Sequence, residues 1–359
     1  MQSESLTSGD YMFEKSFITD CEGPLTLNDN AYELSANFIE DGGELFKILS
    51  LYDDYLADIV KKENYKAGNT LKLILPFFVA ENLTNDDLVD FSKRHIYAVN
   101  DSKFLIEYLQ KAMNTYIVST SYGQYIEAIS NYMDLPFKNT FYTKVNLDNL
   151  TLNSDEIKKI GEFKELILNN PEDYELFDDI FFSQISKMGI YEEIKKIDVV
   201  GGLGKKLAID EIIERDGIDV NKMLYIGDSI TDVEPLEFAR KNNGLSISFN
   251  GNEYPLRVAE IAIVSPSAIA TALITDIYAK YDKNKVLEFI NDYNELNDYE
   301  ILFKSYNVDL EIMDKFFSVF DNENFPIIQV ITEYNFNDIL VLSKSMRNSI
   351  RGQDIGGLG

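Results

Sequence analysis

The sequence predicts an α/β fold: a doubly wound parallel sheet with an inserted helical cap and a C-terminal helical extension. Apolar runs that end at Thr19 and at Gly227 are each followed by an acidic turn, as in strands that deliver side chains to the edge of an open sheet. From residue 205 onward, helical and strand patterns alternate, which indicates a parallel sheet covered on both faces. Residues 28–100 instead show helical spacing and almost no strand alternation. We therefore expect an insertion after the first strand.

The expected elements follow from these patterns in chain order. Apolar residues recur at helical spacing within 44–52 and 56–60, and a helix that begins at Asp101–Ser102 leads to a strand at 114–118. About 80 residues separate Thr120 from Gly201, more than a bare strand–helix connection requires, so residues 140–200 are expected to be a mainly helical elaboration. The later elements are predicted as helix 205–216, strand 222–228, helix 233–242, strands 245–250 and 260–265, and helix 267–280.

These patterns divide the chain into three parts. The core comprises residues 1–27 and 101–280, including the elaboration at about 140–200, and the helical cap comprises residues 28–100. Residues 281–359 form the C-terminal extension, whose amphipathic patterns at 286–290 and 313–320 indicate packing on the core or on a protein partner. The glycine-rich segment Gly352–Gly359 is expected to be a flexible tail.

Composition excludes several classes of partner. The 359 residues include 61 acidic and 33 basic side chains, for a formal net charge of -28, which repels nucleic acid and anionic membranes. No apolar stretch reaches the roughly 18 residues of a transmembrane helix, and Met1–Tyr11 is polar and lacks a signal pattern. The single cysteine, Cys21, permits no internal disulfide. We expect a cytoplasmic protein without membrane insertion.

Carboxylates follow both apolar runs. Asp20 and Glu22 follow the first run, and Asp228 and Asp232 follow the second. Mg²⁺ prefers hard oxygen ligands and keeps several waters, so one or two carboxylates and a substrate phosphate suffice to hold it. An Asp20 carboxylate whose charge is screened by the metal could attack phosphorus, and Glu22 could protonate the leaving oxygen. These residues predict Mg²⁺-dependent chemistry on a phosphate ester.

Four motifs occur in a characteristic order. They read Asp20-Cys21-Glu22-Gly23-Pro24-Leu25-Thr26, Asn114-Thr115-Tyr116-Ile117-Val118-Ser119-Thr120, Gly204-Lys205-Lys206-Leu207-Ala208-Ile209 and Gly227-Asp228-Ser229-Ile230-Thr231-Asp232. In this order they resemble the haloacid dehalogenase (HAD) superfamily of aspartyl phosphotransferases, over roughly residues 13 to 275. The resemblance implies a HAD-like Rossmannoid core whose cap closes over the site, and a Mg²⁺-dependent phosphatase that hydrolyses a small phosphorylated metabolite through an aspartyl phosphate.

The resemblance also implies the catalytic and substrate-binding residues. Asp20 would be the nucleophile and Glu22 the general acid and base. Ser119 and Lys205 would hold the phosphoryl oxygens, and Thr120, which follows Ser119, is a further candidate for substrate binding. Most phosphatases of the superfamily carry Asp where this chain has Glu22, so the sequence leaves open whether Glu22 supports full hydrolysis.

The metal ligands follow from the first and last motifs. The resemblance implies that Mg²⁺ is held by Asp20, by the backbone carbonyl of Glu22 and by Asp228, while Asp232 orients a ligand or Lys205. Without a metal, these carboxylates would be expected to repel one another. Asn250, in the turn 249–252 that ends strand 245–250, is a candidate substrate-binding residue because that turn lies at the same edge of the sheet.

A second hypothesis belongs to another functional class. The first motif and the C-terminal extension also resemble an archaeal family of HAD-like proteins named as a subunit of a membrane-bound energy-converting hydrogenase. That resemblance implies an accessory or interaction subunit of a larger complex, which keeps the HAD fold and binds a protein partner through the extension. The intact motifs favour catalysis. The substrate's identity and the oligomeric state stay open.

Overall fold

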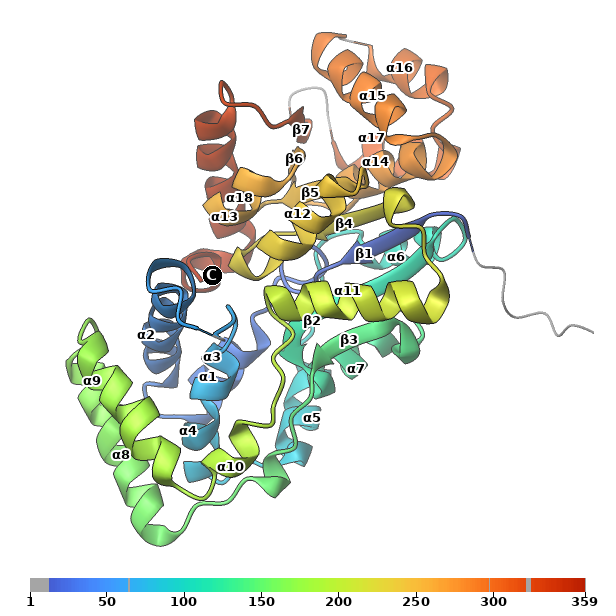
Figure 1. Ribbon diagram of the computed structural model, residues 1–359. Coiled ribbons are helices and arrows are strands. Elements are labelled where there is room, and N and C mark those ends of the chain that lie inside the picture. The colour runs from blue at the N-terminus through green and yellow to red at the C-terminus, as the bar shows by residue number, and fades with distance from the viewer. Residues whose placement is uncertain (1–12, 64, 297, 321–323, 359) are drawn as a thin grey trace, which may run out of the picture.

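The centre of the computed structural model is a seven-stranded sheet with the order β3-β2-β1-β4-β5-β6-β7 (Figure 1). The structure describes residues 13–63, 65–296, 298–320 and 324–358; the polar segment Met1–Tyr11 lies outside them. The strands are β1 (Ser16–Thr19), β2 (Asn114–Tyr122), β3 (Thr140–Thr143), β4 (Met223–Gly227), β5 (Leu245–Phe249), β6 (Ile261–Val264) and β7 (Ile327–Val330). The first six are parallel, which confirms the predicted fold class. β7 is antiparallel to β6 and comes from the extension, where only helices were expected.

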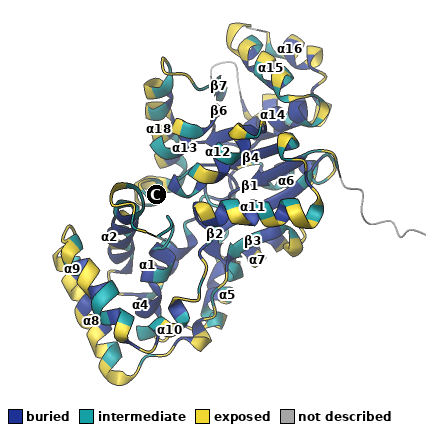
Figure 2. Cartoon of the chain, in the orientation of Figure 1, coloured by how far each residue is buried: buried dark blue, intermediate teal, exposed yellow. Residues whose placement is uncertain are grey.

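Helices cover both faces of the sheet because alternate strand residues point to opposite sides. Phe17 and Leu224 belong to the apolar cluster formed with α6 (Ser102–Leu109), α7 (Gly123–Tyr132) and α14 (Ile269–Lys280). Their neighbours Ile18 and Tyr225 belong to the cluster on the other face, formed with α11 (Leu203–Asp216) and α12 (Val233–Lys241). A short helix, α13 (Glu253–Val258), connects β5 to β6. Figure 2 shows the strands buried between these layers.

Two separate stretches of the chain pack together beside the sheet, and from here on we use the word cap for the helices of both. The first contains α1 (Asn30–Phe38), α2 (Gly42–Asp54), α3 (Thr70–Leu73), α4 (Leu75–Ala80) and α5 (Asn85–Arg94). The second contains α8 (Ser154–Asn169), α9 (Tyr174–Asp178) and α10 (Tyr191–Ile194). Both contribute to one apolar cluster, in which the rings of Tyr52 and Phe177 meet edge to face at 5.3 Å between centroids. Within residues 140–200, the structure therefore places β3 in the core sheet and the helices in the cap.

Short non-α turns complete the chain. Two π-helical segments, η1 (Tyr55–Ile59) and η4 (Asp179–Gln184), continue α2 and α9. The 3-10 turns are η2 (Phe137–Asn139), η3 (Leu147–Asn149), η5 (Ile185–Lys187), η6 (Val220–Lys222) and η7 (Ile230–Asp232).

The extension returns the chain to the carboxyl edge of the sheet. Its helices α15 (Lys283–Glu295), α16 (Tyr299–Ser305) and α17 (Leu310–Val319) join the same apolar cluster as α14. After β7, α18 (Phe336–Gly356) runs back beside α13, and the chain ends near α2 (Figure 1). α18 bends at Gly352, which has a φ of 78°, and then makes a last turn where a flexible tail was expected. None of the helices in the described ranges combines the length and apolar character needed to cross a membrane.

Candidate active site

The four motifs meet at the carboxyl ends of β1, β2 and β4. β1 lies between β2 and β4 and pairs in parallel with both, so the residues that follow these strands are neighbours. They surround a cavity of about 100 Å³. The core contributes Asp20, Glu22, Ser119, Thr120 and Asp228, the cap contributes Phe46, Asp53 and Asp54, and the extension contributes Arg347, Arg351 and Leu358.

Lys205 bridges two of the predicted carboxylates behind the cavity. Its Nζ lies 2.6 Å from Asp20 Oδ2 and 2.7 Å from Asp232 Oδ1, and its side chain is fully buried. Burial lowers the pKa of Lys205, but the two carboxylates outweigh this effect and raise the pKa above its ordinary value. Lys205 is therefore a charged ammonium that holds Asp20 in place, and it lies behind Asp20 rather than in the cavity wall.

Asp20 is buried at the end of β1. Burial raises the pKa of Asp20 to about 7; Lys205 opposes this rise, whereas Asp232 and Asp228 add to it. The Cys21 backbone N–H donates to Asp20 Oδ1 at 2.6 Å. The carboxylate is thus held on both oxygens, and its ionisation depends on nearby cations.

Asp232 is occupied by partners of its own. Its Oδ1 accepts hydrogen bonds from Lys205 and from the Tyr225 hydroxyl, the latter at 2.7 Å. Its Oδ2 accepts from the backbone N–H groups of Asp228 at 3.0 Å and Ser229 at 3.1 Å. Asp232 therefore orients Lys205 and the loop after β4, and it does not line the cavity.

Glu22 faces the cavity from the loop after β1. Its Oε1 accepts a hydrogen bond from the backbone N–H of Asn30, at the start of α1, at 2.6 Å. Burial raises the pKa of Glu22 well above its usual range, and the neighbouring Asp29 adds to this rise. A raised pKa favours the protonated form, which is the form that a general acid requires.

The hydroxyls of the second motif also line the cavity. The register between β2 and β3 shifts between Val118 and Tyr122, and such an irregularity redirects the side chains of a strand. Ser119 Oγ accepts from the Ser121 N–H at 3.2 Å, while the buried Thr120 Oγ1 has no hydrogen-bond partner among the described residues. A buried hydroxyl without a partner costs about 1–3 kcal/mol, so a ligand oxygen next to Thr120 would be stabilising.

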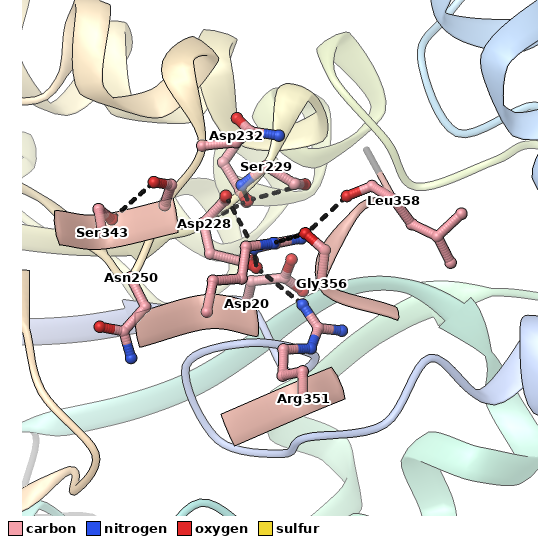
Figure 3. A network of polar contacts seen from close by, with 12 residues as sticks. Asp20, Asp228, Ser229, Asp232, Asn250, Ser343, Arg351, Gly356 and Leu358 are labelled. Atoms are coloured by element: carbon pink, nitrogen blue, oxygen red, sulfur yellow. Dashed lines mark hydrogen bonds and ion pairs between the residues drawn. The ribbon is translucent and has the colours of Figure 1, made fainter. Parts of the chain in front are cut away.

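Asn250 does not reach the site. Its Nδ2 donates to Ser265 O at 2.7 Å, and its Oδ1 accepts from Ser265 N–H at 2.9 Å. Figure 3 shows its amide pointing away from the carboxylates. The predicted substrate-binding role thus has no support in this geometry, because the side chain joins the turns after β5 and β6.

The acidic residues fit a divalent cation. One carboxylate oxygen each from Asp20, Asp228 and Asp232 lies within 4.8 Å of the others. Asp228 Oδ1 is buried and has no partner in the described part of the chain. Gly23, at a φ of 102°, packs so closely on this carboxylate that a Cβ would lie 2.2 Å from Asp228 Oδ2. Hard oxygen ligands of this kind suit Mg²⁺, and Asp20 and Asp228 are placed to hold it.

Two residues of the site were not predicted from the sequence. Arg347 and Arg351, on α18, both form ion pairs with Asp228 Oδ2, that of Arg351 Nη1 at 3.1 Å (Figure 3). Their spacing of four residues places them on one helix face, but nothing in the sequence identifies the carboxylate that they bind. With Lys205, they neutralise the carboxylates that were expected to repel one another.

Comparisons with known proteins bear on the fold. No protein-family model and no curated protein matches the chain. The structure is similar to that of a gene product from Archaeoglobus fulgidus, with a TM-score of 0.79 and 28% identity, over 96% of this chain and 99% of that one. Because so little of this chain is unmatched, the similarity includes most of the C-terminal extension.

Two phosphoserine phosphatase structures are also similar to the chain. One holds an analogue of the phospho-aspartyl intermediate. Its TM-score is 0.44 at 15% sequence identity, and the match covers 70% of this chain and 93% of that one. The other is bound to substrate. Its TM-score is 0.46 at 15% sequence identity, and the match covers 71% of this chain and 94% of that one. These likenesses concern the fold. The sheet order and the helices inserted after β1 agree with the HAD-like fold implied by the motifs.

Proposed function

We propose that the protein is a Mg²⁺-dependent phosphatase that hydrolyses a small phosphomonoester through an aspartyl phosphate on Asp20. The observation that carries this proposal is the position of Asp20, which borders the cavity in front while Lys205 holds it at 2.6 Å from behind. Glu22, whose pKa is raised by burial, lies at the same cavity and can supply a proton. A buried nucleophile and a protonated acid at one cavity suit the cleavage of a phosphate ester.

The first half-reaction would form the aspartyl phosphate. An Asp20 oxygen bonds to phosphorus while the ester P–O bond breaks, and Glu22 gives its proton to the departing alcohol oxygen. The Ser119 and Thr120 hydroxyls would donate hydrogen bonds to the phosphoryl oxygens. Mg²⁺, held by Asp20, Asp228 and the Glu22 backbone carbonyl, would screen the charges of the nucleophile and the phosphate.

The second half-reaction would release phosphate. Glu22, now a carboxylate, accepts a proton from water as the water oxygen bonds to phosphorus, and the bond between phosphorus and Asp20 breaks. Lys205 and Asp232 keep Asp20 in position throughout. Glu22 leaves this cycle protonated, ready for the next ester.

The cavity supports a small substrate. Its volume of about 100 Å³ is room for several waters, since one water needs roughly 10–15 Å³ by the same measure. Cap residues such as Phe46 and Asp54 form part of the wall and would contact the rest of the ester. We place this activity in the cytoplasm, in keeping with the single, buried Cys21.

The test is phosphate release from a panel of small phosphomonoesters in the presence of Mg²⁺. We expect turnover that disappears with EDTA and in the Asp20→Asn variant, and that persists in Asp210→Asn, which removes a half-buried carboxylate that pairs with Lys206 outside the cavity. Turnover that persists in Asp20→Asn would refute the aspartyl-phosphate mechanism. No turnover on any ester, together with co-purification of a larger complex, would favour the accessory-subunit alternative.

A further inference from the structure

The C-terminal helix brings two cations to a carboxylate of the proposed metal site. Arg351 Nη1 lies 3.1 Å from Asp228 Oδ2, and its other nitrogens donate to the backbone oxygens of Asn28 at 2.7 Å and Leu27 at 3.1 Å. Arg347 Nη1 binds the same carboxylate oxygen and also the Asp228 backbone oxygen at 3.2 Å. A single oxygen of Asp228 is thus shared by two guanidinium groups.

The arginines are fixed parts of the site rather than mobile surface side chains. The Arg347 side chain is only 3% exposed, and its Nε and Nη2 donate to the carbonyls of Gly356 at 2.9 Å and Leu358 at 3.0 Å. One turn earlier in α18, Ser343 Oγ donates to Gly251 O at 2.6 Å. The helix is therefore anchored to the loop after β5, and its last turn folds back on Arg347.

The three carboxylates that could hold a metal have three cations as partners. The carboxylates Asp20, Asp228 and Asp232 face the cations Lys205, Arg347 and Arg351. A divalent cation at Asp228 would add two positive charges beside two guanidinium groups. Like charges repel strongly where water is excluded, so the metal and the arginines oppose each other at this carboxylate.

We infer that Arg347 and Arg351 form an internal counter-cation for Asp228 that competes with divalent metal ions for this carboxylate. The inference rests on the proposed function, because the metal site is part of it. Asp228 Oδ1 has no partner among the described residues, so the metal approaches there while the arginines hold Oδ2. The C-terminal helix thereby sets the Mg²⁺ concentration at which the site fills.

The arginines could instead help the metal to bind by orienting Asp228. Groups that hydrogen-bond a metal ligand can orient it, and their removal typically weakens metal binding about 10- to 100-fold. The Asp228 carboxylate is held by two full positive charges, however, and these withdraw the negative charge that the metal requires. Competition and orientation therefore predict changes in Mg²⁺ affinity of opposite sign.

The experiment is a calorimetric titration of the metal-free, full-length protein with Mg²⁺, without substrate. Arg351→Gln removes one competing charge, and we expect its Mg²⁺ dissociation constant to fall at least about tenfold. Arg347→Gln, a second variant at the same carboxylate, should shift the constant in the same direction. Arg351→Lys keeps the charge and should bind Mg²⁺ like the wild type.

A matched control removes a positive charge from the same helix outside the site. Lys344 is half exposed and pairs with Glu253 at 3.4 Å, so Lys344→Gln should leave the dissociation constant unchanged. Circular dichroism checks that each variant is folded. If Arg351→Gln and Arg347→Gln bind Mg²⁺ no more tightly than a wild type that does bind it, the inference is wrong and the proposed function stands. If neither the wild type nor these variants bind Mg²⁺, the inference fails, and the phosphate-release assay with Mg²⁺ and EDTA decides the proposed function separately.

Discussion

The two sides of the acidic cluster are neutralised by different parts of the chain. Asp20 and Asp232 share Lys205, which lies 27 residues before Asp232 and, like both carboxylates, belongs to a motif of the core. Asp228 instead depends on Arg347 and on Arg351, both more than 100 residues away in the extension. A buried carboxylate needs a cationic partner in both places, but only Asp20 and Asp232 receive theirs from the core. The extension is therefore a component of the site rather than an appendage to the fold.

Removal of Lys205 should give the largest loss of stability. Lys205→Met leaves Asp20 and Asp232 buried without their cation, and breaking a buried ion pair in this way costs about 3–5 kcal/mol. The measurement is the free energy of unfolding in urea. Lys206→Met is the neighbouring control, since Lys206 pairs with Asp210 near the surface, where such pairs contribute about 0–1 kcal/mol. Equal losses in the two variants would show that Lys205 is not the cation on which the core side depends.

The other side of the comparison is tested by a double-mutant cycle. Arg347→Met alone leaves Asp228 short of one partner, whereas Arg347→Met combined with Asp228→Asn removes both charges, so we expect a coupling energy of about 1–3 kcal/mol in the unfolding free energy. The exposed pair of Lys241 and Glu237 is the control, with an expected coupling below about 1 kcal/mol. A coupling as small as that of the control would mean that the extension does not stabilise the core through Asp228.

The difference between the core motifs and the extension also explains which site residues could be predicted from the sequence. Asp20 and Asp228 were selected because each directly follows a strand, and such positions meet at one edge of a parallel sheet. Lys205 was selected by the resemblance of its motif to the HAD superfamily. Arg347 and Arg351 follow no strand, and their target lies far away in the chain. Asn250 was selected by its place after β5, but a turn also needs hydrogen bonds of its own, and Ser265 takes both ends of its amide.

Fold prediction succeeded where the pattern is local. The predicted alternation after residue 205 agrees closely with α11, β4, α12, β5, β6 and α14, but the short helix α13 between β5 and β6 was not predicted. β7 was not predicted, because four residues at the edge of a sheet carry too little pattern to be distinguished from a loop. Helices 154–169 and 191–194 were expected as an elaboration of the core, but amphipathic spacing shows only that a face is buried, not which module buries it.

The smallest expected effect is the pH dependence of stability that comes from Glu33, near the contact of the extension with Asn28. Glu33 on α1 accepts hydrogen bonds from the Asn28 amide at 2.9 and 2.7 Å, and the backbone oxygen of Asn28 binds Arg351. Burial raises the pKa of Glu33 from 4.5 to about 7. The folded state thus binds a proton more tightly than the unfolded state, so this group's contribution to stability is complete below pH 4.5 and is lost as the pH rises through 7.

Glu33→Gln removes that titration and keeps an amide oxygen as an acceptor for Asn28. Because Glu33 is partly exposed, we expect the variant to gain only up to about 1 kcal/mol relative to wild type between acidic and neutral pH. The measurement is the difference in unfolding free energy between the two proteins from pH 4 to pH 8, which cancels the other carboxylates that titrate in this range. If that difference is flat, Glu33 is solvated like a surface carboxylate. The loop that carries Asn28 would then be open to water, and the contact of Asn28 with Arg351 could not exclude water from the Asp228 side of the site.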